Sequence, residues 1–228
     1  MKLWNALVVA SLVAVCAPHA VVAQGAAWPD PTPDRGFLVA KGTTLPRGRG
    51  YVAAVMPGAV DVTYGVSDRI TVMGGTVPWT VFQGPFIGFG SLRYGIAQST
   101  WVDLAVGVFG AMVAEHDEFD GAAWPFVSTT VGSPTLSVTG LVGAGSNTSI
   151  IDGDLNNHLL LQGEAEWQVT SQVKLIAEAL YLGEGYDPIG GAGLRFWARP
   201  GMIELGVARE FTGSGSSWLP WVALAYGF

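Results

Sequence analysis

Two of the three histidines lie in acidic segments and could do chemistry. His116 is flanked by acids in the segment Glu115–Asp120, and His158 closely follows Asp152 and Asp154. A histidine beside an aspartate can act as a general base that activates water or a serine hydroxyl. The residues His116, His158, Asp152 and Asp154 are therefore candidates for a hydrolytic site.

Metal and cofactor chemistry has weaker support in the sequence. Asp152 and Asp154 flank a glycine, and carboxylate oxygens are the ligands that Ca²⁺ prefers, but the rest of a twelve-residue calcium loop is missing. No cysteine and histidine spacing indicates zinc, and no phosphate-binding or dinucleotide fingerprint is present. We expect no cofactor and no metal.

A second group of charged residues alternates with apolar ones. Successive side chains of an extended strand point to opposite faces, so Glu164 and Glu166 share one face and Trp167 and Val169 the other. The same pattern places eight charged side chains on an inner, polar face: Arg93, Asp103, Glu164, Glu166, Lys174, Glu178, Arg195 and Glu204. We expect ion-paired neighbourhoods there: Arg93 near Asp103, Lys174 near Glu164 and Glu166, and Arg195 between Glu178 and Glu204.

The elements that must position these charges are short strands. Strand-like segments are expected at 50–56, 59–66, 69–77, 85–97, 100–113, 124–132, 135–145, 158–169, 172–182, 189–198, 202–210 and 218–228. Tight turns alternate with longer polar connections at 78–84, 114–123, 146–157, 183–188 and 211–217, with Pro57-Gly58 as a short exception. Twelve is an even number, as a closed barrel of antiparallel hairpins requires, and a ten-stranded arrangement stays open.

The composition agrees with a transmembrane β-barrel. Half of the residues are hydrophobic and only 13% are charged, against about 25% in typical soluble domains. Beyond the N-terminal segment no run of 18 apolar residues occurs, which excludes a bundle of membrane helices. The formal net charge of −7 argues against binding nucleic acid through bulk charge.

The C-terminal segment Trp218–Phe228 ends in an aromatic residue. Val222, Leu224, Tyr226 and Phe228 occupy one face of a strand there. This pattern resembles the terminal strand of bacterial outer-membrane β-barrels, in which it is the signal that the barrel assembly machinery reads. The hairpin Tyr64–Arg69 resembles that of small outer-membrane barrels without an assigned activity. The resemblance implies a closed, antiparallel, up-and-down, all-β transmembrane barrel in a bacterial outer membrane.

The N-terminal residues indicate export. Apolar residues Leu3–Ala17 precede Val21-Val22-Ala23, the pattern of a signal peptide over 1–23 that is cleaved before Gln24. An uncleaved anchor and lipidation at Cys16 are the alternatives. Residues 24–48 are rich in Pro, Asp and Gly and are expected to form a periplasmic leader, with the barrel over 49–228.

Two classes of function follow. The first is a non-enzymatic barrel, either structural or adhesive, or a narrow passive channel with a polar, ion-paired lumen. The second is an outer-membrane hydrolase of lipid or peptide with its His/Asp site at the extracellular rim. Barrel phospholipases and deacylases carry His and Ser two residues apart, whereas Glu118 and Leu160 stand at those positions here. The expected partners are outer-membrane lipid, lipopolysaccharide, the assembly machinery and small solutes.

Overall fold

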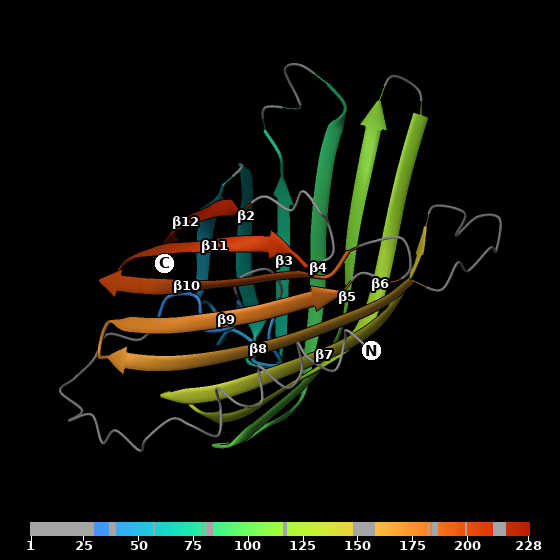
Figure 1. The fold of residues 1–228 in the computed structure, drawn as a ribbon. Helices are drawn as coiled ribbons and strands as arrows, with labels where there is room; N and C mark the ends of the chain where they lie inside the picture. The colour runs from blue at the N-terminus through green and yellow to red at the C-terminus, as the bar shows by residue number, and fades with distance from the viewer. Residues whose placement is uncertain are drawn as a thin grey trace.

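The structure is a computed structural model that describes residues 30–36, 40–56, 58–78, 80, 84–115, 118–147, 158–181, 183, 187–198, 200–211 and 218–228. These residues form a closed antiparallel barrel of twelve strands (Figure 1). The strands are β1 Gly50–Val55, β2 Ala59–Ser67, β3 Ile70–Thr76, β4 Phe86–Gln98, β5 Val102–Glu115, β6 Glu118–Ser133, β7 Leu136–Asn147, β8 His158–Thr170, β9 Val173–Tyr181, β10 Ile189–Ala198, β11 Gly201–Glu210 and β12 Leu219–Gly227.

Each strand pairs with its neighbours in sequence, and β1 pairs with β12 to close the sheet. Two further backbone hydrogen bonds continue this seam. The N–H of Gly50 donates to the carbonyl of Phe228 at 3.0 Å, and the N–H of Phe228 donates to the carbonyl of Gly50 at 2.8 Å. The prediction of a twelve-stranded up-and-down barrel is confirmed, and the ten-stranded alternative is wrong because β1 and β2 are separate, paired strands.

The largest difference from the expected strands lies in the β5–β6 hairpin. The sequence predicts a polar connection over 114–123, but the ladder continues until Glu115 lies opposite Glu118. Strand pairing uses backbone groups, so it can continue past the apolar segment into residues with charged side chains. The connection is therefore two residues long, and His116 lies within it, outside the described residues.

The outer face of the barrel is apolar. In β10, Leu194 and Phe196 are 39% and 38% exposed, whereas Arg195 between them is fully buried. In β11, Ile203 and Leu205 are similarly exposed on either side of a buried Glu204. These outward and inward positions are those that the alternation predicts. No helix in the described part of the chain is long and apolar enough to cross a membrane.

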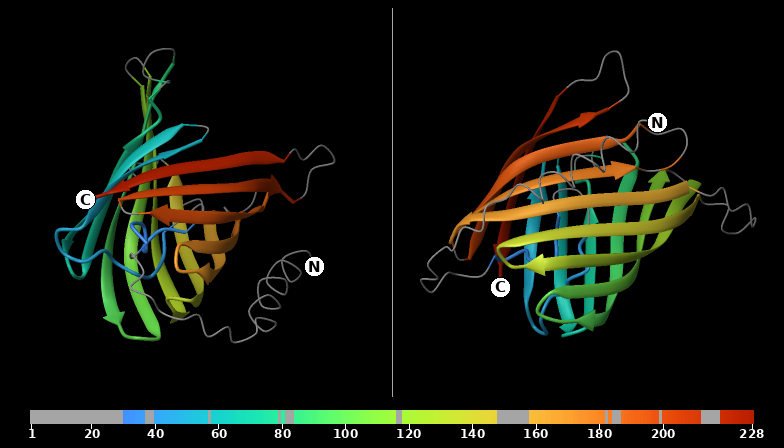
Figure 2. Two further views of the ribbon diagram at one scale, coloured as in Figure 1. Left: turned by 90° about the vertical axis from the view of Figure 1, so that its left-hand side faces the viewer. Right: turned by 60° about the horizontal axis from the view of Figure 1, so that its bottom comes forward.

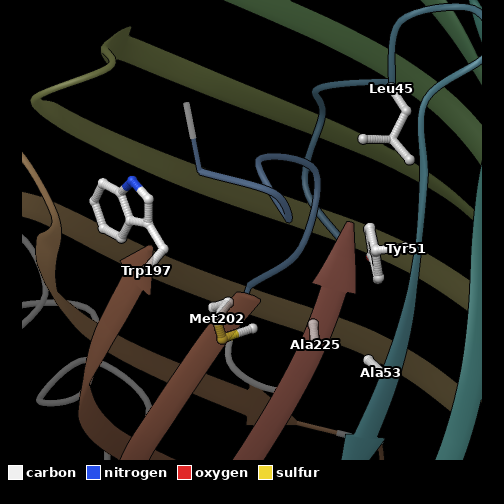
Figure 3. Close-up of a cluster of buried hydrophobic side chains, with 6 residues drawn as sticks. All are labelled: Leu45, Tyr51, Ala53, Trp197, Met202 and Ala225. Atoms are coloured by element: carbon white, nitrogen blue, oxygen red, sulfur yellow. The ribbon is translucent and has the colours of Figure 1, made fainter. Parts of the chain in front are cut away.

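Apolar side chains also meet inside the barrel. One cluster lies beside the tight β10–β11 turn and comprises Leu45, Tyr51, Ala53, Trp197, Met202 and Ala225 (Figure 3). A second cluster, on β6, β7 and β8, comprises Phe126, Leu141 and Leu160, with Phe109, Trp124 and Leu180 packed against it.

Candidate functional site

The described part of the predicted leader lies inside the barrel. We call residues 30–36 and 40–45 the plug segment; its trace runs within the ring of strands (Figure 2, dark blue). Thr32 and Asp34 are fully buried, and Lys41 and Leu45 are 2% exposed. The segment folds back on itself, because the N–H of Lys41 donates to the carbonyl of Asp34 at 3.0 Å. The sequence did not place these residues in the lumen.

Arg195 of β10 binds the plug segment most extensively. Its Nε donates to Glu204 Oε2 at 2.8 Å, and its Nη1 donates to Asp30 Oδ2 at 3.3 Å. Its terminal nitrogens also donate, at 3.1–3.3 Å, to the backbone carbonyls of Thr32, Arg35 and Gly36. A planar guanidinium offers five donors in a fixed fork, so one buried side chain can serve several acceptors.

Arg93 of β4 makes the corresponding contacts on the other side of the lumen. Its Nη1 donates to the carbonyls of Asp34, Lys41 and Thr43 at 2.9–3.1 Å, and its Nη2 pairs with the Asp34 carboxylate. The expected neighbour, Asp103, instead accepts a hydrogen bond from Thr43 Oγ1 at 2.9 Å. The register explains this, since Arg93 lies opposite Gly107 and four residues away from Asp103 along β5.

Two lysines also connect the plug segment to the barrel wall by binding carboxylates. Lys41 of the plug segment lies 2.5 Å from Glu166 Oε2 and 3.7 Å from Glu164 Oε1. Lys174 Nζ lies 3.0 Å from Asp30 Oδ2 and 3.3 Å from Glu166 Oε2. Burial alone would raise the pKa of Asp30, but Lys174, Arg195 and Lys41 outweigh it and hold this pKa well below its ordinary value.

The strand register modifies two expected neighbourhoods. Lys174 contacts Glu166 and lies opposite Gln168, whereas Glu164 lies opposite Glu178. Arg195 contacts Glu204, whereas Glu178 lies opposite Gly191. The structure adds charged residues that sequence reasoning missed: Asp30, Asp34, Arg35, Lys41 and Asp61. Asp61 alternates with Thr63 in β2, a signal that could have placed it inside, and it lies 3.3 Å from Arg35.

The residues proposed for hydrolysis are not placed by the structure. His116, Asp152 and Asp154 lie outside the described residues. The backbone of His158 begins β8 opposite Gly145, and its side chain is outside the described part. Among described residues, no group of three or more His, Cys, Asp or Glu side chains could hold a metal ion. The rim hydrolase stays a prediction.

The four residues of the expected assembly signal share one face of the C-terminal strand. Leu224, Tyr226 and Phe228 are 50%, 59% and 54% exposed, and Val222 is half-buried on the same side. The residues between them, Ala223 and Ala225, face the lumen and are buried. The assembly role of this face stays a prediction.

The fold is that of the small porins of bacterial outer membranes. The chain superposes on the structure titled KdgM porin in complex with disordered oligogalacturonate, with a TM-score of 0.60 at 12% identity. A second KdgM porin structure gives a TM-score of 0.59 at the same identity, and both matches cover 79% of this chain and 99% of the porin. No protein-family model and no curated protein sequence matches the chain. At this identity the likeness concerns the fold.

Proposed function

We propose that the protein is a non-enzymatic barrel of the bacterial outer membrane that acts as a narrow passive channel, closed at rest by its plug segment. The observation that carries this proposal is the bonding of the plug segment to inward-facing charges. Arg93 and Arg195, on nearly opposite walls, donate to its backbone, and Lys41 reaches back to β8. A segment held in this way obstructs the lumen and excludes large solutes.

The membrane location rests on two independent features. The outward residues of every strand are predominantly apolar, with 37–51% exposure for residues such as Leu92, Leu175 and Val131. A sheet with a continuous apolar outer face is stable in lipid, where closure satisfies every backbone group. The likeness to porins supports the same location.

The charge of the lumen favours cations and neutral solutes over anions. Within the described residues, eight carboxylates face the lumen: Asp30, Asp34, Asp61, Asp103, Glu164, Glu166, Glu178 and Glu204. Five cations oppose them: Arg35, Lys41, Arg93, Lys174 and Arg195. A net negative passage repels polyanions. Oligogalacturonate, an acidic saccharide, is therefore a poor candidate for this chain despite its presence with the KdgM porin.

Gly42 offers a direct test of the plug segment. A Cβ at this position would lie 2.8 Å from the carbonyl oxygen of Asp103 and 2.9 Å from the amide nitrogen of Thr130, both backbone atoms of the wall. The substitution Gly42→Val therefore displaces the plug segment without altering a wall residue. In planar bilayers we expect low, intermittent conductance from the wild type and a severalfold higher conductance from the variant. Pro46→Ala, at an exposed site, is the matched control.

The same preparation separates the alternatives. A reversal potential that indicates anion preference, or equal conductance of wild type and Gly42→Val, would contradict the proposal. Silence of both proteins would favour a structural barrel. Lipase and protease assays of the wild type and a His158→Ala variant test the hydrolase hypothesis. Activity in the wild type that is abolished by the substitution would support an enzyme and contradict the proposed channel function.

A further inference from the structure

Three arginines lie close together at the end of the barrel that carries the tight turns. The N–H of Arg47 donates to Asp68 Oδ1 at 3.0 Å, which places Arg47 beside the β2–β3 turn that contains Arg69. The carbonyl of Arg49 accepts a hydrogen bond from the N–H of Gly65 in β2 at 2.8 Å. All three arginine side chains are exposed. We call Arg47, Arg49 and Arg69 the basic cluster.

The basic cluster is not neutralised by neighbouring side chains. Among the described residues, no ion pair involves any of its three guanidinium groups. Asp68 offers one carboxylate in the adjoining turn, and this group accepts the backbone N–H of Arg47. The described cations that are paired with carboxylates lie in the lumen: Arg35, Lys41, Arg93, Lys174 and Arg195. The end with the tight turns therefore has an excess of exposed positive charge.

The opposite end of the barrel has the reverse balance of charge. In the part of the chain that the structure describes, Arg209 is the one cation at the strand ends and connections there. The acidic residues at these positions are Glu115, Glu118, Asp120, Asp187 and Glu210. Charge is thus separated along the barrel axis. Since outer-membrane barrels have their short turns on the periplasmic side, we expect the basic cluster at the periplasmic leaflet.

The basic cluster adjoins the lipid-facing surface of the barrel. Val66 follows Gly65 in β2 and is 48% exposed. On the other side, the carbonyl of Arg69 accepts a hydrogen bond from the N–H of Gly95 at 2.8 Å, and Ile96, the next residue of β4, is 45% exposed. Cationic groups that lie directly beside outward apolar residues are at the level where acyl chains give way to phospholipid headgroups.

We propose that the basic cluster binds the headgroup phosphate of an anionic phospholipid, such as phosphatidylglycerol, in the periplasmic leaflet. A guanidinium binds phosphate oxygens through paired N–H donors, and basic residues clustered beside a membrane attract anionic lipids. Val66 and Ile96 contact the first part of the acyl chains of the same lipid. The inference does not depend on the channel function, since a sealed barrel in this membrane presents the same surface.

Native mass spectrometry of the detergent-solubilised full-length protein tests this surface. The probe is an equimolar mixture of phosphatidylglycerol and phosphatidylethanolamine with identical acyl chains. We expect the wild type to bind phosphatidylglycerol preferentially, and Arg49→Gln and Arg69→Gln each to reduce this preference by about fivefold. Arg209→Gln, which removes a cation at the opposite end, should retain it. Asp68→Asn keeps the acceptor for Arg47 but removes the carboxylate, so it should increase the preference.

The variants and a competitor distinguish the outcomes. A loss confined to Arg49→Gln and Arg69→Gln, with unchanged thermal unfolding of both proteins, supports the surface. An equal loss in Arg209→Gln would assign the preference to total charge and overturn the proposal, as would the absence of any preference in the wild type. Displacement of the lipid by an equal concentration of inorganic phosphate would show that a free anion suffices and would also overturn it. Asp68→Asn has the opposite expected sign, so a decrease in that variant contradicts the proposal even if an arginine variant unfolds.

Discussion

At the scale of single residues, Arg195 shows why a buried cation can be essential in the lumen. It is fully buried, and its guanidinium contacts carboxylates from β11 and the plug segment at once. Burying a charge is unfavourable unless opposite charges and hydrogen bonds compensate it. Removing the cation therefore leaves Glu204 and Asp30 as inadequately compensated buried anions.

We expect Arg195→Met to lower the free energy of unfolding by about 3–5 kcal/mol, measured by urea denaturation with tryptophan fluorescence. Arg209→Met is the control. Arg209 is the second-last residue of β11, with its guanidinium 5.4 Å from the ring centre of Trp218, a contact worth about 0.5–1 kcal/mol where solvent is near. Equal losses in the two variants would contradict the role of Arg195.

Asp30 predicts a defined dependence on pH. Its pKa in the folded protein lies below the ordinary value of 3.8, so its contribution to stability is present above that value and disappears as the pH falls below it. The difference in unfolding free energy between the wild type and Asp30→Asn should stay constant from about pH 8 to pH 5 and shrink below about pH 4. A difference that grew on acidification would show that Asp30 is not paired with Lys174 and Arg195.

At the scale of elements, each strand separates two environments by alternation. In β11, Ile203 and Leu205 are exposed on the outside, and Glu204 between them is buried in the lumen. A shift of one residue in register would exchange the two faces, so the apolar pattern specifies the register. The tight β10–β11 turn then places Arg195 opposite Glu204.

Ile203→Arg tests whether this outer face contacts lipid. An arginine facing the hydrocarbon near the middle of the bilayer costs about 2–4 kcal/mol. Refolding into vesicles should show a loss of that size, while Ile203→Ala, which removes apolar contact without adding charge, should cost less. An Ile203→Arg variant as stable as the wild type would indicate that this face lies in water.

At the scale of the whole molecule, closure depends on the two ends of the barrel sequence. β1 and β12 are paired, and Phe228 exchanges two backbone hydrogen bonds with Gly50. A closed sheet has no edge strand, which is the condition for a stable sheet in lipid. The last residue therefore contributes through its backbone to closure, and through its exposed ring to the outer face.

Two variants separate these contributions of Phe228. Deleting the residue should lower the free energy of unfolding by about 1–3 kcal/mol, because two hydrogen bonds are lost. Phe228→Ala keeps the backbone bonds, so we expect its stability to remain near that of the wild type while its yield in the outer membrane falls. Normal membrane yield of Phe228→Ala in cells would contradict the predicted assembly signal.

The sequence by itself predicted most of the strands and their facing, with twelve as the expected number and ten as the alternative. These are local properties. The alternation of Leu194, Arg195 and Phe196 predicts which face of β10 is polar, and this prediction does not require knowledge of the neighbouring strands. Local pattern was less informative at strand ends such as Glu115–Glu118, because backbone pairing does not require apolar side chains.

Only the tertiary structure decided what fills the lumen. Asp30 and Arg195 are 165 residues apart in sequence, and Arg93 is 59 residues from Asp34. No periodicity links such residues, and the plug segment has no alternation of its own to reveal its partners. Its place follows from charge complementarity and backbone hydrogen bonding inside a closed barrel, and both exist only after the twelve strands have paired.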